Sequence, residues 1–283
     1  MRQLIIPIKL KNVYGTITNS IINDGSQHIY AGGVTSGMNN EGGTQTIDSL
    51  GLIYNSALKS QDADLFVSGT ASTITINTGT MDILNGGVVT GYGSVLNHRF
   101  GADYDTHLSA GGVLNTGSQN EPGQINTAQS FNAVIESGGT QNIQNGGISQ
   151  GSTVQQGGTL VVQANYHPED QNIAPTAGVA NNSIVYGEID NHGSTDNDTV
   201  VKVGGRYSSG YARSSDTNTE NISTSNNLLV EQGGYAQLSG YSAINNMTVA
   251  GMVDSRDQSS LDDTVITSTG AMTDDHRGRQ LRQ

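Results

Sequence analysis

The chain has 283 residues, of which 38 are glycine, and it contains neither cysteine nor tryptophan. Its net charge of −13 argues against nucleic acid as a partner, because phosphate binding needs clustered Lys and Arg. The lack of cysteine excludes disulfides and thiolate metal sites. Only 34% of the residues are apolar and 5% are aromatic, so a thin, elongated core is easier to fill than a thick one.

The first 24 residues are expected to form lead-in strands, at Leu4–Ile8 and Val13–Ile22. The first apolar run spans about five residues, whereas a secretory signal needs about 7–15, so we expect no signal peptide in this chain. No segment approaches the ~18 apolar residues of a membrane helix. We therefore expect no direct membrane insertion of this segment.

Glycines mark a short repeat within residues 25–162, which we predict to be a solenoid. One series is equally spaced, its sequence numbers rising by 18 at each step: Gly33, Gly51, Gly69 and Gly87. A second series has the same step with one substitution: Gly25, Gly43, Gln61 and Gly79. Gly139, Gly147 and Gly158 continue the pattern. Glycine adopts positive φ without a Cβ clash, so we predict that all of these glycines lie at the corners of a coil.

Aliphatic residues follow the same steps. Ile29, Ile47, Leu65 and Ile83 come four places after the second series, and Ile143 and Val162 come four places after Gly139 and Gly158. One repeat buries about three aliphatics at ~1.5–3 kcal/mol each, but ordering its backbone costs roughly 1–2 kcal/mol per residue. A single repeat therefore cannot fold alone. Stacked repeats can, which predicts an all-β parallel solenoid with these aliphatics in one stacked core.

The rest of the chain departs from this repeat. Residues 98–107 are predicted to loop out of the coil, and 163–228 to be an irregular polar insertion with short strands. The spacing of Gly234 and Leu238 predicts that solenoid coils return in 229–253. Residues 254–283 are predicted to be a flexible tail.

Four carboxylate pairs are candidates for acid/base or calcium sites: Asp62 with Asp64, Glu188 with Asp190, Asp196 with Asp198, and Asp262 with Asp263. In the first three pairs the i, i+2 spacing on a strand places both groups on one face. The simpler interpretation is that these are solvent-facing strand positions. The six histidines lack metal-ligand spacing, and His28 is expected to point outward. We predict no catalytic residue, cofactor or metal site.

Tyrosines are concentrated in the C-terminal half: Tyr186, Tyr207, Tyr211, Tyr235 and Tyr241. They have two interpretations. They could stack on sugars in a shallow groove, or they could pack along the edge of a thin coil.

The segments Gly42–Ile47 and Ser137–Gly147 resemble the passenger repeats of AIDA-like autotransporter adhesins of Gram-negative bacteria. The resemblance implies a right-handed parallel β-helix with short repeats of about 18–20 residues. It also implies a location at the cell surface or outside the cell, and a role in adhesion or autoaggregation. Some members of that family carry heptose on repeat Ser or Thr residues. The matching candidates for O-glycosylation here are Ser137, Thr140, Ser149 and Thr159.

The leading hypothesis is therefore a structural or adhesive passenger region that binds a second copy of itself, a host surface or a glycan. Self-association would use polar ladders of Ser, Thr, Asn and Gln between rods lying side by side. Two alternatives remain open. The first is a glycan-binding or glycan-cleaving β-helix of the polysaccharide lyase or tail-spike type. The second is a truncated remnant of a larger adhesin. As a passenger region, the chain could be one piece of a longer protein, or it could be exported by another route.

Overall fold

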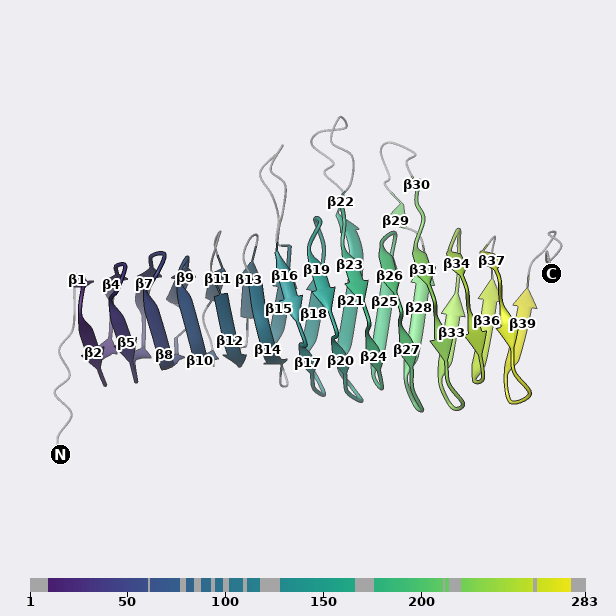
Figure 1. Cartoon of the computed structure of the whole chain (residues 1–283), viewed down its shortest axis with the longest axis horizontal. Coiled ribbons are helices and arrows are strands. Elements are labelled where there is room, and N and C mark those ends of the chain that lie inside the picture. Colours follow the sequence, from purple (N-terminus) through teal and green to yellow (C-terminus); the bar gives the residue numbers. More distant parts are fainter. Residues whose placement is uncertain are drawn as a thin grey trace.

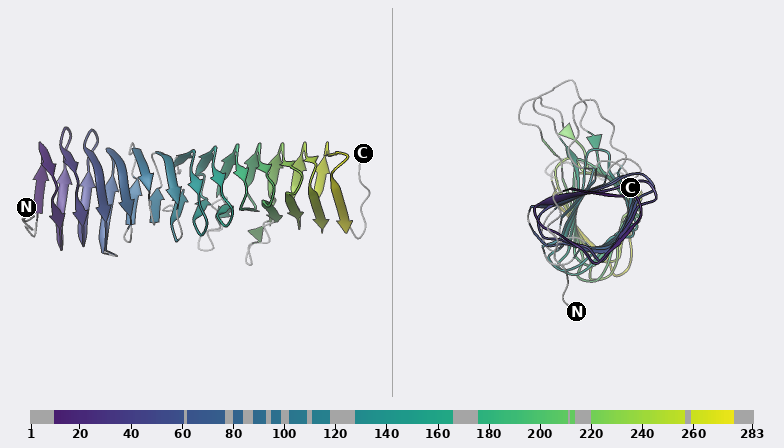
Figure 2. Two further views of the ribbon diagram at one scale, coloured as in Figure 1. Left: turned by 90° about the horizontal axis from the view of Figure 1, so that it is seen from below. Right: turned by 90° about the vertical axis from the view of Figure 1, so that its left-hand side faces the viewer.

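The structure is a computed structural model. It describes residues 10–60, 62–76, 80–83, 88–92, 95–98, 102–108, 111–117, 128–165, 176–210, 212–213, 220–256 and 259–275. The elements are short strands that wind into a straight rod, with the N-terminal coils at one end and the C-terminal coils at the other (Figure 1). Viewed from its end, the rod is a stack of closely similar coils around one axis (Figure 2). The predicted fold class, a parallel β-solenoid, is confirmed.

One parallel sheet, sheet A, runs the length of the rod, and each of its strands pairs with the strand one coil away. Its strands are β1 (Leu10–Val13), β4 (Gly25–Ile29), β7 (Gly43–Ile47), β9 (Ala63–Val67), β11 (Thr80–Ile83), β13 (Val95–His98), β15 (Val113–Thr116), β18 (Thr140–Ile143), β21 (Thr159–Asn165), β25 (Glu188–His192), β28 (Arg206–Gly210), β33 (Tyr235–Leu238), β36 (Met252–Arg256) and β39 (Ala271–Asp275).

The rest of each coil forms sheet B, which is also parallel and which bends once, so that it has two arms. The first arm contains β2 (Thr16–Thr18), β5 (Val34–Ser36), β16 (Gln129–Phe131), β19 (Ile148–Gln150), β23 (Val179–Asn181), β26 (Thr195–Asn197), β31 (Thr224–Asn226), β34 (Ala243–Asn245) and β37 (Ser260–Asp262). The second arm contains β3 (Ile21–Ile22), β6 (Asn39–Asn40), β17 (Val134–Ile135), β20 (Thr153–Val154), β24 (Ile184–Val185), β27 (Val200–Val201), β32 (Leu229–Val230), β35 (Thr248–Val249) and β38 (Val265–Ile266). Four strands run through both arms: β8 (Leu52–Leu58), β10 (Thr70–Ile76), β12 (Val88–Tyr92) and β14 (Ala102–Leu108).

Three further strands lie outside these two sheets. β22 (Thr176–Ala177) pairs antiparallel with β21, and β29 (Ala212–Arg213) pairs antiparallel with β30 (Glu220–Asn221). All three lie where the chain passes from sheet A to the first arm of sheet B, on one side of the rod (Figures 1 and 2).

The paired glycines at the corners have two separate roles, as Gly138 and Gly139 show. Gly138 has φ +78°, a left-handed conformation that glycine adopts without a Cβ clash. Gly139 has an ordinary φ, but a Cβ built on it would lie 2.3 Å from the carbonyl oxygen of Leu108 in the preceding coil. The first glycine thus allows the turn, and the second allows neighbouring coils to approach closely.

The first glycine series marks a true structural repeat. Gly33, Gly51 and Gly69 directly precede strands of sheet B, and the residues after them pair in register, with Val34 opposite Leu52 and Leu52 opposite Thr70. The second series does not keep its register. Gly43 pairs with Gly25 in the preceding coil, but in the following coil it pairs with Ala63 and not with position 61, which an equal step would require. Gly79, Gly87 and Gln61 lie outside the described residues. Gly147 precedes a strand of sheet B, and Gly158 precedes one of sheet A.

This shift in register changes the predicted core stack. Ile29 pairs with Ile47, and Ile47 pairs with Val67, whereas Leu65 pairs with Gln45 in the neighbouring inward column. The prediction that Leu65 continues the column of Ile29 and Ile47 is therefore wrong, because the corner before β9 is longer by two positions. Leu65 is still buried, with 1% of its surface exposed.

The later members of the predicted stack return to the first column. Val67 pairs with Ile83, and Ile143 pairs with Val162. Ile143 and Val162 are both fully buried. The hydrophobic core consists of buried aliphatic side chains stacked along the axis of the rod.

The solenoid extends further than the sequence predicted. Residues 102–108 form β14 within sheet B and are not part of a loop outside the coil. The segment 163–228 contains complete coils from β23 to β28, and 254–275 contains the last coil, with β37, β38 and β39. Residues 10–22 already form a full first coil. Polar composition hid these coils, because only every second side chain of such strands faces the core.

Within the part of the chain that the structure describes, no helix is long and apolar enough to cross a bilayer.

Candidate functional site

The bend between the two arms of sheet B is held by Asn or Asp in the left-handed conformation. In the described coils these residues and their φ values are Asn19 (51°), Asn55 (49°), Asp105 (51°), Asn132 (55°), Asn182 (54°), Asp198 (55°), Asn227 (61°), Asn246 (58°) and Asp263 (51°), whereas Gly37 and Gly151 hold the same bend in two other coils. Asn and Asp tolerate this region better than other residues with side chains. The side chains of all nine Asn and Asp residues are exposed to solvent.

The residue before each bend points outward from the first arm and stacks in register on its neighbours. Asn181 pairs with Asn197, Asn197 with Asn226, Asn226 with Asn245, and Asn245 with Asp262. Together with the following bend residues they form two adjacent outward columns over consecutive coils. We call this surface the asparagine track; its members are Asn181–Asn182, Asn197–Asp198, Asn226–Asn227, Asn245–Asn246 and Asp262–Asp263.

Hydrogen bonds between the amides run along the track. Asn197 Nδ2 donates to Asn181 Oδ1 at 2.7 Å, Asn226 Nδ2 to Asn197 Oδ1 at 2.7 Å, and Asn245 Nδ2 to Asn226 Oδ1 at 2.8 Å. In the bend column, Asn227 Nδ2 donates to Asp198 Oδ1 at 2.9 Å. Every amide in the first column is therefore held in one orientation by its neighbours.

An aromatic stack precedes the track in the same column. Tyr104 pairs with Phe131, Phe131 with Gln150, and Gln150 with Asn181. The rings of Tyr104 and Phe131 lie parallel, with centroids 4.8 Å apart and an interplanar angle of 8°. The column thus passes from aromatic rings to amides to a carboxylate at Asp262.

The sequence predicts polar ladders of this kind, but sequence reasoning missed the residues that form this one. Its signal in the sequence is a recurrent five-residue pattern. Two Asn or Asp residues come first, one residue of any type follows, and two mostly aliphatic residues end the pattern, as in Asn226 to Val230 and Asn245 to Val249. The glycine repeat is out of step with this pattern in the C-terminal half, so a search for equal glycine steps does not find it.

A second polar group lies inside the rod, beneath the track. The Asp196 carboxylate is fully buried and accepts hydrogen bonds from Tyr207 Oη, Asn191 Nδ2 and Ser225 Oγ, each at 2.8 Å. Tyr207 is also fully buried and points inward from β28.

Burial raises the pKa of Asp196 above its usual value, although the donated hydrogen bonds oppose this change. Burial also raises the pKa of Tyr207 well above its usual value, and the neighbouring Asp196 carboxylate adds to the effect. The pair is shielded from solvent, so it is part of the core of the rod and does not offer a reactive group to a ligand.

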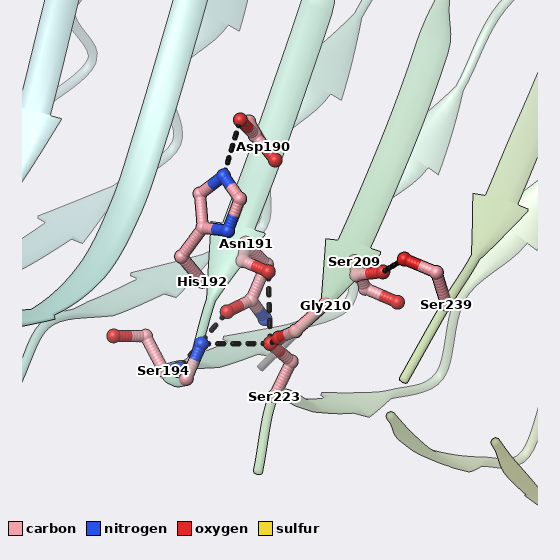
Figure 3. A network of polar contacts seen from close by, with 9 residues as sticks. Asp190, Asn191, His192, Ser194, Ser209, Gly210, Ser223 and Ser239 are labelled. Atoms are coloured by element: carbon pink, nitrogen blue, oxygen red, sulfur yellow. Dashed lines mark hydrogen bonds and ion pairs between the residues drawn. The ribbon is translucent and has the colours of Figure 1, made fainter. Parts of the chain in front are cut away.

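The polar contacts continue to the corner after β25 (Figure 3). The backbone N–H of Ser194 donates to Asn191 Oδ1 at 3.1 Å, and Ser223 Oγ donates to the Asn191 carbonyl oxygen at 2.8 Å. The backbone N–H of Gly193 donates to Ser223 Oγ at 2.8 Å, and Ser223 Oγ also contacts the carbonyl oxygen of Gly210. These bonds join the ends of neighbouring coils where the chain leaves sheet A.

On the outer face of β25, the side chains of Glu188, Asp190 and His192 all point toward solvent. His192 Nε2 lies 2.6 Å from Asp190 Oδ2, and this hydrogen bond raises the pKa of His192. Glu188 is exposed and pairs in register with Arg206, whose guanidinium carbon lies 5.2 Å from the centre of the Tyr235 ring.

Two further ion pairs lie on the surface of these coils. Lys202 Nζ lies 2.6 Å from Glu231 Oε1, and this contact raises the pKa of Lys202. Arg256 donates from Nε to Asp254 Oδ2 at 2.8 Å, which lowers the pKa of Asp254. Exposed pairs of this kind contribute little to stability, because solvent screens their attraction.

The four predicted carboxylate pairs do not share one arrangement. Asp196 is buried and Asp198 is exposed, so the prediction that they share a face is wrong. The left-handed residue at the bend breaks the alternation of the strand. Asp62 is exposed just before β9, and Asp64 is partly exposed within that strand. Asp262 and Asp263 belong to the asparagine track.

The predicted tyrosine group is also divided. Tyr207 is buried, Tyr186 is 40% exposed, and Tyr235 lies beneath Arg206. Tyr241 lies in a turn with φ 54°. Tyr211 lies outside the described residues. The four described tyrosines do not form one groove.

At the N-terminal end, His28 is half-exposed and its Nε2 lies 2.7 Å from Asp48 Oδ1. Its ring stacks on Tyr30, which in turn stacks on Tyr14. In the described part of the chain, no group of three or more His, Cys, Asp or Glu side chains could hold a metal ion.

Of the residues that the family resemblance marks for glycosylation, Ser137 is exposed at a corner, and Thr140 and Thr159 stack on the outer face of sheet A. Ser149 is fully buried; its Oγ lies 2.6 Å from Ser152 Oγ. Ser149 is therefore inaccessible to a glycosyltransferase in the folded rod, because its strand alternation points it inward.

No protein-family model and no curated protein matches the sequence. Among solved structures, the chain is similar to the TibC-catalyzed hyper-glycosylated TibA55-350 fragment, with a TM-score of 0.77 and 19% sequence identity. The match covers 95% of this chain and 93% of that one. The likeness shows that the two chains share one fold, a β-solenoid, along nearly their whole length.

Proposed function

We propose that this chain is the adhesive passenger region of an autotransporter-like surface protein, which mediates cell adhesion or autoaggregation without a catalytic site. The main support is the fold that it shares with the hyper-glycosylated TibA fragment over 95% of its length. The resemblance of Gly42–Ile47 and Ser137–Gly147 to the repeats of AIDA-like adhesins supports the same proposal from the sequence.

The shape of the molecule suits this role. A straight rod presents long, flat sides, and lateral contacts of modest strength add up along such a surface. The polar ladders predicted for side-by-side contact have a counterpart in the asparagine track and in the outward amides of sheet A, where Asn142 Nδ2 donates to Asn115 Oδ1 at 2.7 Å.

The proposal includes a cell-surface or secreted location and O-glycosylation at Ser137, Thr140 and Thr159. The last two are outward neighbours on adjacent strands of sheet A. The rings of sugars attached there would lie on the solvent side of the sheet, where they would not disturb the core.

The alternative, a glycan-cleaving β-helix, is favoured by one observation: Glu188, Asp190 and His192 share the outer face of β25. Against it, Asp190 is hydrogen-bonded to His192 and is not paired with Glu188 as an acid/base couple. Release of reducing sugar from a polysaccharide panel, abolished by Glu188→Gln, would support the enzyme.

A display experiment tests the main proposal. The chain is presented on the surface of a bacterial strain that does not aggregate by itself, and settling of the culture and attachment to epithelial cells are measured. We expect faster settling or attachment compared with cells that display an unrelated β-solenoid. Equal behaviour of the two strains would contradict an adhesive function.

A further inference from the structure

We propose that the asparagine track is the binding surface for a linear polysaccharide of neutral or amino sugars, which lies along the axis of the rod. The assignment rests on the proposed adhesive function and names the class of ligand that this function requires. It is carried by the side chains of the track, their orientation and their charge.

The backbone alone does not explain why the track is built from Asn and Asp. The same bend is held by Gly151, with φ 72°, one coil before the track. Another corner uses Gly138, Gly157 and Gly204 for the same left-handed conformation. Glycine would therefore serve at Asn182, Asn227 and Asn246, yet these positions carry exposed amides.

The amides are pre-oriented for a ligand. An amide has two N–H donors and two oxygen lone pairs, and the ladder uses one N–H and one lone pair of Asn197 and of Asn226. The remaining donor and acceptor can bind a sugar hydroxyl together. Because the ladder already fixes each side chain, little rotamer entropy is lost on binding.

The spacing favours a polymer over a single sugar. Equivalent amides recur once per coil, about 4.8 Å apart along a straight line. The stacked rings of Tyr104 and Phe131 continue the same line and offer apolar contact to the C–H face of a sugar ring. A linear chain of sugars gains a contact at each coil, so affinity should rise steeply with chain length.

The charge of the track selects among polysaccharides. It contains the carboxylates of Asp198, Asp262 and Asp263 and has no Lys, Arg or His. The negative charges of sulfated or uronic-acid polymers would be repelled by these carboxylates. Neutral sugars avoid this repulsion, and the ammonium groups of amino sugars are attracted by it.

The test is titration calorimetry of the full chain with four probes: N-acetylglucosamine, its β-1,4-linked hexamer, the glucosamine hexamer and a galacturonic acid hexamer. We expect both hexosamine hexamers to bind at least tenfold more tightly than the monosaccharide. The glucosamine hexamer should lose affinity as salt is added, because its attraction is electrostatic. Equal binding of the galacturonic acid hexamer would overturn the assignment.

Two variants separate side-chain recognition from folding. Asn197→Ala with Asn226→Ala should weaken binding of the hexosamine hexamers at least tenfold. Asn227→Gly with Asn246→Gly retains the left-handed bend and should weaken it about fivefold. The matched control is Asn142→Ala, which removes an equivalent ladder amide from sheet A, where Asn142 donates to Asn115 at 2.7 Å. Its affinity should stay within twofold of the wild type.

Circular dichroism of each variant establishes that the rod is folded. Wild-type affinity in both double variants would overturn the proposal. If the double variants self-associate less than the wild type in sedimentation while their sugar binding is unchanged, the proposal would also be overturned, and the track would instead be a contact between copies of the chain. If displayed chains adhere but no hexamer binds, the proposed function stands and this assignment falls; the reverse result removes the proposed function alone.

Discussion

The coils of residues 10–76 and those of residues 179–275 reach the same geometry from different sequences. In the first region, sheet B repeats at equal steps, with Thr16, Val34, Leu52 and Thr70 in register. In the second region the steps are unequal: Arg206 of sheet A pairs with Tyr235, which pairs in turn with the much nearer Met252. Equal steps are therefore not required for a continuous parallel sheet.

The unequal steps arise at one place in the coil. The longer steps contain β22 or the β29–β30 hairpin, which lie between sheet A and the first arm of sheet B. Extra residues at this corner leave the parallel ladders on both sides intact. The lesson is that the corners and inward columns define the coil, while the length of the chain between them is free to vary.

The interiors also differ between the two regions. In the first, the side chains of Gln45 and Gln27 form a neutral hydrogen bond of 2.9 Å inside the coil. In the second, the buried carboxylate of Asp196 accepts hydrogen bonds from Tyr207, Asn191 and Ser225. The first interior should be insensitive to pH and the second should not.

The largest effect is expected at a glycine that contacts the neighbouring coil. In Gly205→Ala the new Cβ would lie 2.1 Å from the carbonyl oxygen of Val185, so we expect a loss of about 4 kcal/mol in unfolding free energy. In Gly204→Ala the new Cβ would have no neighbouring atom within 4 Å, so only the backbone φ of +80° is strained, and this costs about 1 kcal/mol. Urea denaturation of both variants measures the difference. Equal losses would show that close approach of the coils is not the reason for the second glycine.

The next effect is expected at the buried carboxylate. Asp196→Ala leaves the donors of Tyr207, Asn191 and Ser225 without their acceptor, and an unsatisfied buried donor costs about 1–3 kcal/mol. We expect a total loss of about 3 kcal/mol, because some donors will find new partners. Thermal unfolding measures it. A loss below about 1 kcal/mol would mean that the cluster contributes little to the second region.

The pH dependence of stability should also differ between the two regions. Burial raises the pKa of Asp196 in the folded rod above the ordinary value of 3.8, so folding favours its protonated form. The part of the stability that depends on protonation of Asp196 is complete below pH 3.8, declines as pH rises through the interval up to the folded-state pKa, and is lost above it. Wild-type protein should lose stability over this interval relative to Asp196→Asn. Parallel curves for the two proteins would contradict the raised pKa.

The smallest effect concerns the first region. Leu50 occupies a turn position that Gly32 fills one coil earlier, with φ 65° and 82% of its surface exposed. Leu50→Gly relieves the left-handed strain but increases the entropy of the unfolded chain, so we expect a net gain of about 0.5–1 kcal/mol. Leu50→Ala retains the strain and serves as the control. Denaturant midpoints of the two variants decide the point.

The sequence was sufficient to predict the parallel solenoid, because Gly33, Gly51 and Gly69 occur at equal steps and precede strands that pair in register. It misplaced Leu65, since a corner longer by two positions moves a side chain to another column without changing its burial. It also missed the coils in 176–210, whose inward residues include Asp196 and Asn191 in place of aliphatics.

The candidate site was harder to predict. Asn197, Asn226 and Asn245 are stacked neighbours, but the first step along the sequence is much longer than the second, so no fixed period relates them. Their alignment depends on where the chain leaves and re-enters the sheet. That information lies in the pairing of coils and not in the spacing of residue types.

The most direct test of the account asks whether Asn197 and Asn226 are true neighbours across the insertion between them. The chain has no native cysteine, so Asn197→Cys with Asn226→Cys reports only on this contact. Neighbouring strands of a parallel sheet lie about 4.8 Å apart, which is within the range for a disulfide. We expect efficient intramolecular cross-linking of this pair and little for Asn197→Cys with Asn245→Cys, which lie two coils apart. Equal cross-linking of both pairs, or none in the first, would contradict the aligned columns on which the asparagine track depends.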